Sequence, residues 1–152
     1  MAIKIEKILF PTDFSECARH AMMYALSLAT EYKAQLIVLH VVPDLNIPPE
    51  MEASAGALYD EMGKTARAKI VKLIPRRFLE KIKVQNVIVR GVPFLEIIKE
   101  AKKRNADLIT VGTHGRTGLQ HAVFGSVAEN VARKAPCPVL IVRHPEVEFV
   151  SP

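Results

Sequence analysis

The stretch LITVGTHGRTGLQHAVFGSVAENVARK, Leu108–Lys134, contains an apolar run, a glycine-rich segment and a helical pattern in direct succession. The run Leu108–Val111 is short and continuous, as expected for a buried strand. Four of the chain's seven glycines lie in Gly112–Gly125. The pattern over Ser126–Lys134 is helical, and two prolines follow it. The stretch therefore predicts a strand that leads into a helix through a long glycine-rich loop.

Four further apolar runs have the same character as Leu108–Val111. They are continuous rather than alternating, which is typical of parallel strands that are covered on both faces. They occupy Ile8–Phe10, Leu36–Val42, Val87–Val89 and Val139–Val142. We therefore expect five parallel strands.

Helical patterns separate these runs. A first helix is predicted after Ser15, a candidate N-cap, with one apolar face at helical spacing. That face comprises Ala18, Ala21, Met22, Ala25, Leu28, Ala29 and Tyr32. A second helix is predicted over much of Ala53–Ile74. A third is predicted after Pro93, where we expect Leu95, Ile98 and Ala101 to face inward.

Strands that alternate with helices predict right-handed crossovers and an α/β fold. We expect an open, doubly wound, five-stranded parallel sheet with helices on both faces, and we expect residues 1–152 to form one domain. The tail Glu146–Val150 alternates polar and apolar residues, so a short edge strand and a frayed terminus both stay open.

The composition excludes several classes of protein. Apolar residues make up 49% of the chain and charged residues 24%, which is typical of a globular protein. The net charge is +5, but the basic residues are not interleaved with aromatic ones, so nucleic-acid binding is not expected. No apolar stretch has the length of a membrane span or of a signal peptide. We expect a soluble, cytoplasmic protein.

The glycine-rich loop has the chemistry of an anion site. It joins the carboxyl end of a strand to the amino end of a helix, where open α/β sheets bind ligands. Glycine at 112 and 115 permits positive φ and close approach of a ligand. The helix that starts at Ser126 offers unpaired N–H groups, and Arg116 adds a positive charge. These features favour phosphate binding, whereas tight turns and simple capping by Ser126 explain them without a ligand.

The loop after the first strand forms the expected opposite wall. If the first and fourth strands are neighbours, Pro11, Thr12 and Asp13 face the glycine-rich loop across one crevice. The Asp13 carboxylate is then placed to accept from hydroxyl or amine donors. Capping of the first helix is an equally simple role for it.

Other sites are not indicated by the sequence. The chain contains neither a P-loop pattern nor a dinucleotide fingerprint after its first strand. Cys17 and Cys137 lack metal-ligand spacing, and His114 and His121 stand seven residues apart. We therefore expect no resident metal site and assign no catalytic residue. His40, inside an apolar run, is expected to be a hydrogen-bonded core residue.

Taken together, these motifs resemble the universal stress protein family over nearly the whole chain. The similarity includes Ile8–Asp13, Leu39–Val42 and Cys137–Val142. The family's ATP-binding branch carries a glycine, two residues, a second glycine, nine residues, then glycine and serine or threonine. Here these positions are Gly112, Gly115, Gly125 and Ser126. Ala128 departs from members that carry a hydroxyl residue there.

The resemblance implies a strand order of 3-2-1-4-5 and a homodimer paired through the last strand, Val139–Val142. It also implies an adenine nucleotide, ATP, with Mg²⁺ or Mn²⁺ as a possible companion. Carried over by position, Pro11, Thr12 and Asp13 flank the adenosine, and the backbone of Val41 reads the adenine edge. Gly112 approaches the ribose. The phosphates are held by Gly115, Arg116, Gly125, Ser126 and Val127.

The expected function is therefore that of an ATP-binding, nucleotide-dependent regulatory or stress-response homodimer. Two alternatives stay open. One is an enzyme that hydrolyses ATP slowly, like the wider group of adenine-nucleotide hydrolases, although the chain lacks their phosphate loop and shows no general base. The other is a structural dimer without nucleotide. We expect no enzymatic activity beyond weak ATP hydrolysis.

Overall fold

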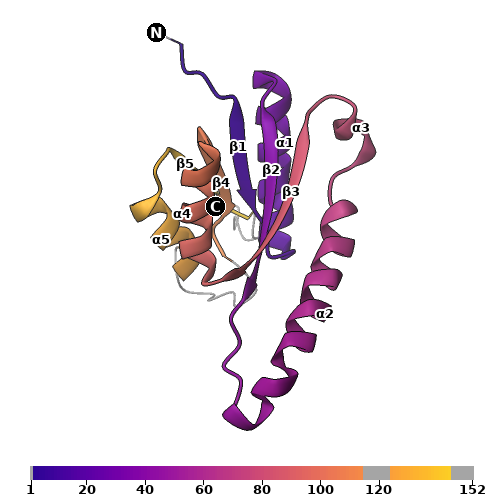
Figure 1. Ribbon diagram of the computed structural model, residues 1–152. Helices are drawn as coiled ribbons and strands as arrows, with labels where there is room; N and C mark the ends of the chain where they lie inside the picture. Colours follow the sequence, from indigo (N-terminus) through magenta and orange to yellow (C-terminus); the bar gives the residue numbers. More distant parts are fainter. Residues whose placement is uncertain (1, 115–123, 145–152) are drawn as a thin grey trace, which may run out of the picture.

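The computed structural model describes residues 2–114 and 124–144 and contains a five-stranded parallel sheet in the order β3-β2-β1-β4-β5 (Figure 1). The elements are β1 (Lys7–Pro11), α1 (Glu16–Tyr32), β2 (Gln35–Pro43), the 3₁₀ turn η1 (Pro49–Met51), α2 (Glu52–Val71), α3 (Arg76–Leu79), β3 (Val84–Gly91), α4 (Pro93–Arg104), β4 (Leu108–Gly112), α5 (Ser126–Lys134) and β5 (Val139–Val142). The predicted sheet, its strand order and the five strand positions are confirmed.

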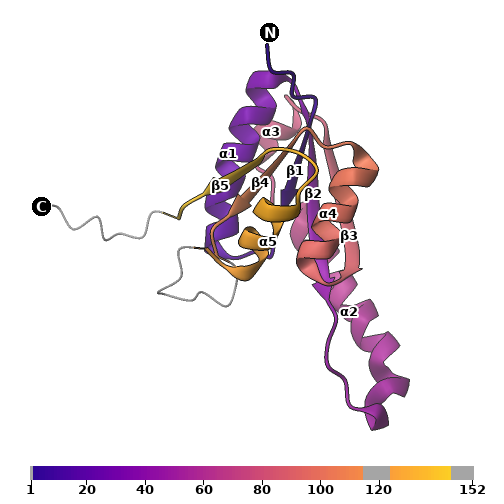
Figure 2. The same cartoon turned by 90° about the vertical axis from the view of Figure 1, so that its left-hand side faces the viewer.

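Two hydrophobic layers enclose the sheet. Successive side chains of β1 alternate, so Ile8 and Phe10 pack under α1 and α2, whereas Leu9 packs under α4 and α5. Figure 2 shows α1 and α4 on opposite sides of the strands. Coverage on both faces explains why the strands are continuously apolar in sequence.

Helix α1 begins where the sequence predicts. The Ser15 hydroxyl accepts a hydrogen bond from the Ala18 N–H over 3.2 Å and caps the helix. Its buried face includes Leu26, whereas Tyr32, predicted to face inward, is 43% exposed. Tyr32 is the last residue of α1, and the left-handed backbone of Lys33 (φ 54°) then turns the chain into β2.

The inward face of α4 agrees with the prediction at Ala101 but differs from it elsewhere. Leu95 is 50% exposed, and the buried residues are Ile97, Glu100 and Ala101. Glu100 occupies an inward position because its carboxylate pairs with the Arg104 guanidinium, with 2.6 Å between Oε2 and Nε. A pattern of apolar residues cannot predict the burial of a charged residue whose charge is neutralised by a partner one turn away.

The second helix predicted over much of Ala53–Ile74 is confirmed as α2. Helix α2 ends at Val71, and Pro75 precedes the short helix α3, which was not predicted. Only Ala66 and Ile70 of α2 are buried, and its amino-terminal half extends beyond the sheet (Figure 1). The tail Glu146–Val150 lies outside the described residues.

Candidate functional site

The candidate site is the crevice at the carboxyl ends of β1 and β4. The two strands pair only through Ile8 with Leu108 and Leu9 with Ile109. Beyond these pairs, β1 leads to α1 on one face of the sheet and β4 leads to α5 on the other. Because the connections after these two neighbouring strands lead to opposite faces of the sheet, a crevice opens between them. Open α/β sheets bind ligands in such a crevice.

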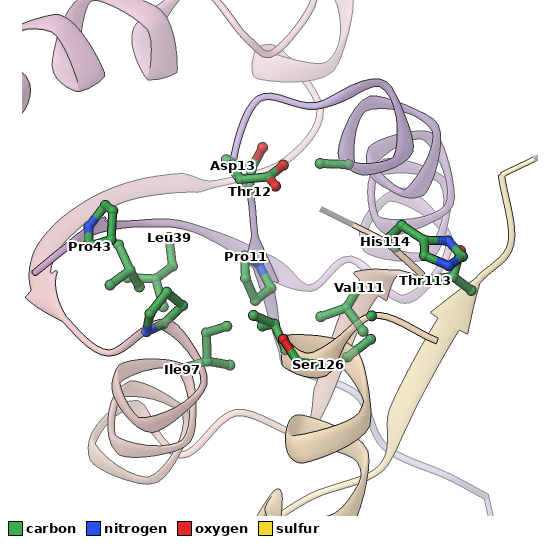
Figure 3. A pocket seen from close by; sticks show the side chains of 17 residues that line it. Pro11, Thr12, Asp13, Leu39, Pro43, Ile97, Val111, Thr113, His114 and Ser126 are labelled. Atoms are coloured by element: carbon green, nitrogen blue, oxygen red, sulfur yellow. The ribbon is translucent and has the colours of Figure 1, made fainter. Parts of the chain in front are cut away.

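A cavity of about 300 Å³ occupies this crevice (Figure 3). Eight of the ten site residues predicted from sequence are described by the structure, and all eight line the cavity. They are Pro11, Thr12, Asp13, Val41, Gly112, Gly125, Ser126 and Val127. The other two, Gly115 and Arg116, lie outside the described residues.

The wall that follows β1 is held by local hydrogen bonds. Thr12 donates its N–H to the Leu39 carbonyl over 2.8 Å, and its hydroxyl accepts from the Phe14 N–H over 3.1 Å. The Asp13 carboxylate accepts from the Ser15 N–H over 2.9 Å. Ser15, not Asp13, therefore caps α1, and the Asp13 side chain lies at the cavity.

The opposite wall is anchored at both ends of the glycine-rich loop. The Gly125 N–H donates to the Thr113 carbonyl over 2.6 Å, and the Thr113 N–H donates to the Val142 carbonyl over 3.2 Å. Gly125 is the N-cap of α5, so Ser126 is the first helical residue and not the cap. The first N–H groups of an α-helix have no acceptor within the helix, and here residues 126–128 line the cavity.

Gly112 serves packing rather than an unusual backbone conformation. Glycine permits a positive φ there, but among the described glycines only Gly91 has one. A Cβ on Gly112 would lie 3.0 Å from the carbonyl oxygen of Cys17, in the first turn of α1. The absence of a side chain therefore lets the end of β4 lie against α1.

Nine lining residues were not predicted from sequence. They are Ala18, Leu39, Pro43, Pro93, Ile97, Val111, Thr113, His114 and Ala128. Most are apolar and lie at the ends of β2 and β4 or at the start of α4. The rule that carboxyl ends of parallel strands converge is the signal that could have found them. Figure 3 shows Pro43, Leu39 and Ile97 together on one side, away from Thr113 and His114.

The cavity thus combines an apolar side with polar groups. Pro43 and Ile97 offer surface to a flat ring, whereas Asp13 and the start of α5 offer polar contacts to a ligand's hydroxyl or anionic groups. Within residues 2–114 and 124–144, no group of three or more His, Cys, Asp or Glu side chains could hold a metal ion. The same residues contain no helix that is long and apolar enough to cross a membrane.

A sequence model of the universal stress protein family matches residues 4–143. The chain belongs to this family. The universal stress protein MJ0531 of Methanocaldococcus jannaschii is 37% identical over 147 residues, which cover 94% of this chain and 85% of that protein.

Solved universal stress proteins have the same fold. The universal stress protein UspA of Lactobacillus plantarum has a TM-score of 0.84 at 26% identity, over 93% of this chain and 100% of that one. A universal stress protein crystallised in complex with cAMP has a TM-score of 0.61 at 26% identity, over 92% and 98% of the two chains.

Proposed function

We propose that this universal stress protein binds ATP in the cavity between β1 and β4 and acts as a nucleotide-dependent regulatory homodimer in a stress response. The observation that carries the proposal is the convergence of Pro11–Asp13 and the amino end of α5 on one cavity. The similarity to a universal stress protein in complex with cAMP supports an adenine nucleotide as the ligand.

The adenosine occupies the side of the cavity near β1 and β2. Pro11 and Thr12 flank it, and the backbone of Val41 reads the adenine edge. The apolar side chains of Pro43 and Ile97 supply contact area for the ring. Asp13 accepts a hydrogen bond from a ribose hydroxyl, since a carboxylate beside the phosphates would be repelled.

The phosphates lie at the amino end of α5. The N–H groups of Ser126 and Val127 and the helix dipole favour negative charge there. Gly125 permits close approach, and Gly112 lies near the ribose. Gly115 and Arg116 complete this part of the site. Ala128 contributes no hydroxyl, so its side chain adds no contact to the phosphates.

A metal ion would accompany the nucleotide. Magnesium is usually bound through substrate phosphates with one or two carboxylates. Asp13 is the carboxylate among the described cavity residues. Mg²⁺ or Mn²⁺ would therefore take its ligands chiefly from ATP.

Calorimetric titration with ATP tests the proposal. We expect a micromolar Kd, roughly −8 kcal/mol, and a protein that binds no ATP at millimolar concentration would contradict it. Mass spectrometry of small molecules released from the purified protein is expected to detect an adenine nucleotide.

A glycine substitution tests the position of the phosphates. Gly125 has φ −71°, so Gly125→Val introduces no left-handed strain, and loss of ATP binding would report blocked approach. Gly63→Val in α2 is the control, because no atom lies within 4 Å of a Cβ there. Unchanged affinity in Gly125→Val would place the phosphates elsewhere.

Slow ATP hydrolysis is a second candidate function, favoured by the Asp13 carboxylate at the cavity. The assay follows ADP, AMP and pyrophosphate for hours in the wild type and in Asp13→Asn. Turnover that is lost in the variant would support an enzyme, and no turnover would leave a binding protein.

A further inference from the structure

His40 is buried beside the candidate site but on the other face of the sheet. It is 8% exposed and lies between Leu39 and Val41 of β2, which both line the cavity. Residues 39 and 41 pack toward α4 and α5, so His40 points toward α1 and α2. His40 itself is not among the cavity-lining residues. The expectation of a hydrogen-bonded core histidine is confirmed.

The imidazole of His40 holds the carbonyl group of Thr12. Nδ1 lies 2.8 Å from the Thr12 oxygen. Because a carbonyl oxygen can only accept, the proton is on Nδ1 and the ring donates. The Thr12 N–H is itself bonded to the Leu39 carbonyl over 2.8 Å. Consecutive residues of β2 therefore hold both polar groups of the Thr12 backbone.

This bond changes how the β1–β2 ladder ends. Odd-numbered residues of β2 pair with β1, since the Gln35 N–H donates to Glu6 and Leu39 accepts from Thr12. A continued ladder would next join the Val41 N–H to the Thr12 carbonyl. Among the described residues, the hydrogen bond to that carbonyl comes from the His40 ring. The His40 ring thus takes the place of the Val41 N–H at the Thr12 carbonyl, and Val41 lines the cavity.

Phe14 connects the same ring to the loop. The two ring centroids are 4.7 Å apart, and the Phe14 N–H donates to the Thr12 hydroxyl. Phe14 has φ 64°, a left-handed conformation that is unfavourable for a bulky residue and persists only where surrounding contacts hold it. The Lys69 Nζ of α2 lies over the Phe14 ring, 5.5 Å from its centroid.

We propose that His40 is a positioning residue for nucleotide binding, which acts through the Thr12 carbonyl to hold the Thr12–Ser15 loop and to keep the Val41 N–H available to the adenine. This inference rests on the proposed function, since it assigns a role at the same site to a residue that does not touch the ligand. The required group is a donor at the position of Nδ1.

Two substitutions of similar size separate this role from packing. In His40→Asn the amide nitrogen can take the place of Nδ1, whereas in His40→Gln it extends to the place of Nε2. We expect His40→Asn to bind ATP within about threefold of the wild type. We expect His40→Gln to bind about tenfold more weakly, the size of one lost hydrogen bond. His20→Gln, in α1 outside the cavity lining, is the control and should keep the wild-type affinity.

Hydrogen exchange provides a readout that requires no nucleotide. In the ligand-free protein, the amides of residues 12–15 should exchange faster in His40→Gln than in the wild type or His40→Asn. Amides in the centre of β4 should be unchanged and serve as the internal reference. Nitrogen NMR of the His40 ring should show the proton on Nδ1.

The outcomes distinguish this proposal from the proposed function. A wild type that binds no ATP contradicts the proposed function, and the exchange comparison then decides the role of His40 alone. Unchanged affinity and exchange in His40→Gln would overturn the positioning role. Equal losses of affinity in both His40 variants, with equal losses of thermal stability, would also overturn it, because packing and not the donor would then be responsible.

Discussion

Gly112 lies so close to Cys17, although 94 residues separate them in the sequence, that a Cβ on Gly112 would be 3.0 Å from the Cys17 carbonyl oxygen and 3.1 Å from its carbonyl carbon. The contact joins the end of β4 to the first turn of α1. These two elements border the candidate site, so the shape of the site depends on a position without a side chain.

Gly112→Ala should therefore lower the free energy of unfolding by about 1–3 kcal/mol, because the new methyl group meets backbone that must shift. Gly63→Ala is the matched control in α2, where a Cβ meets nothing within 4 Å. Because alanine has a higher helix propensity than glycine, the control should raise the free energy of unfolding by up to about 1 kcal/mol. Urea unfolding measures both, and equal stability of Gly112→Ala and the wild type would contradict the packing role.

Thr110→Val should raise the free energy of unfolding by about 1 kcal/mol. Thr110 is fully buried in β4, and its hydroxyl has no hydrogen-bond partner within the described part of the chain. Valine keeps the shape and removes the desolvated hydroxyl. Thr113→Val is the same chemical change at a hydroxyl that lies 3.1 Å from Nδ1 of His114 and should not stabilise. Thermal unfolding of the two variants compares them.

Ile141→Pro should dissociate the proposed homodimer without unfolding the chain. The Ile109 N–H donates to Pro138 and the Thr113 N–H to Val142, so the backbone groups of Ile141 point away from β4. Proline there removes a donor from the outer edge of the sheet only.

Asn86→Pro is the matched control at the opposite edge, since the Leu36 N–H donates to Lys83 and position 86 therefore points away from β2. Sedimentation equilibrium should give a monomer for Ile141→Pro and a dimer for Asn86→Pro and the wild type. A dimer that survives Ile141→Pro would exclude pairing through β5.

Cys137 should be alkylated slowly near neutral pH. Burial raises the pKa of its thiol, and the negative charge of Asp107 raises the pKa further. Only the thiolate reacts, so in the Cys17→Ser variant the pH profile of iodoacetamide labelling should have a higher midpoint than in the urea-unfolded chain. Mass spectrometry measures the labelled fraction, and coincident profiles would contradict the prediction.

The features that were predicted correctly from sequence all have a local signal in the chain. Strands covered on both faces are apolar throughout, so β1, β2 and β4 are visible as runs, and Ser15 marks the start of α1 by local chemistry. The glycine spacing from Gly112 to Gly125 carries the family resemblance. The strand order came from that resemblance and not from the runs.

The features that were predicted wrongly depend on contacts that the sequence pattern does not contain. Glu100 is buried because Arg104 neutralises it, and the apolar face of α4 was consequently misplaced. Ser126 was considered as a cap, but the Gly125 backbone occupies that position. The burial of Glu100 depends on the charge of Arg104, and the start of α5 depends on the backbone of Gly125. A pattern of residue types includes neither.

By itself the sequence determined the strands and most of the helices, and it predicted a crevice after β1 and β4, because periodicity, caps and glycine spacing are local properties of the chain. Only the tertiary structure decided that Gly112 packs on Cys17 and that His40 holds Thr12. Such contacts join residues distant in sequence, and close packing and the need to satisfy buried polar groups select them when the layers come together.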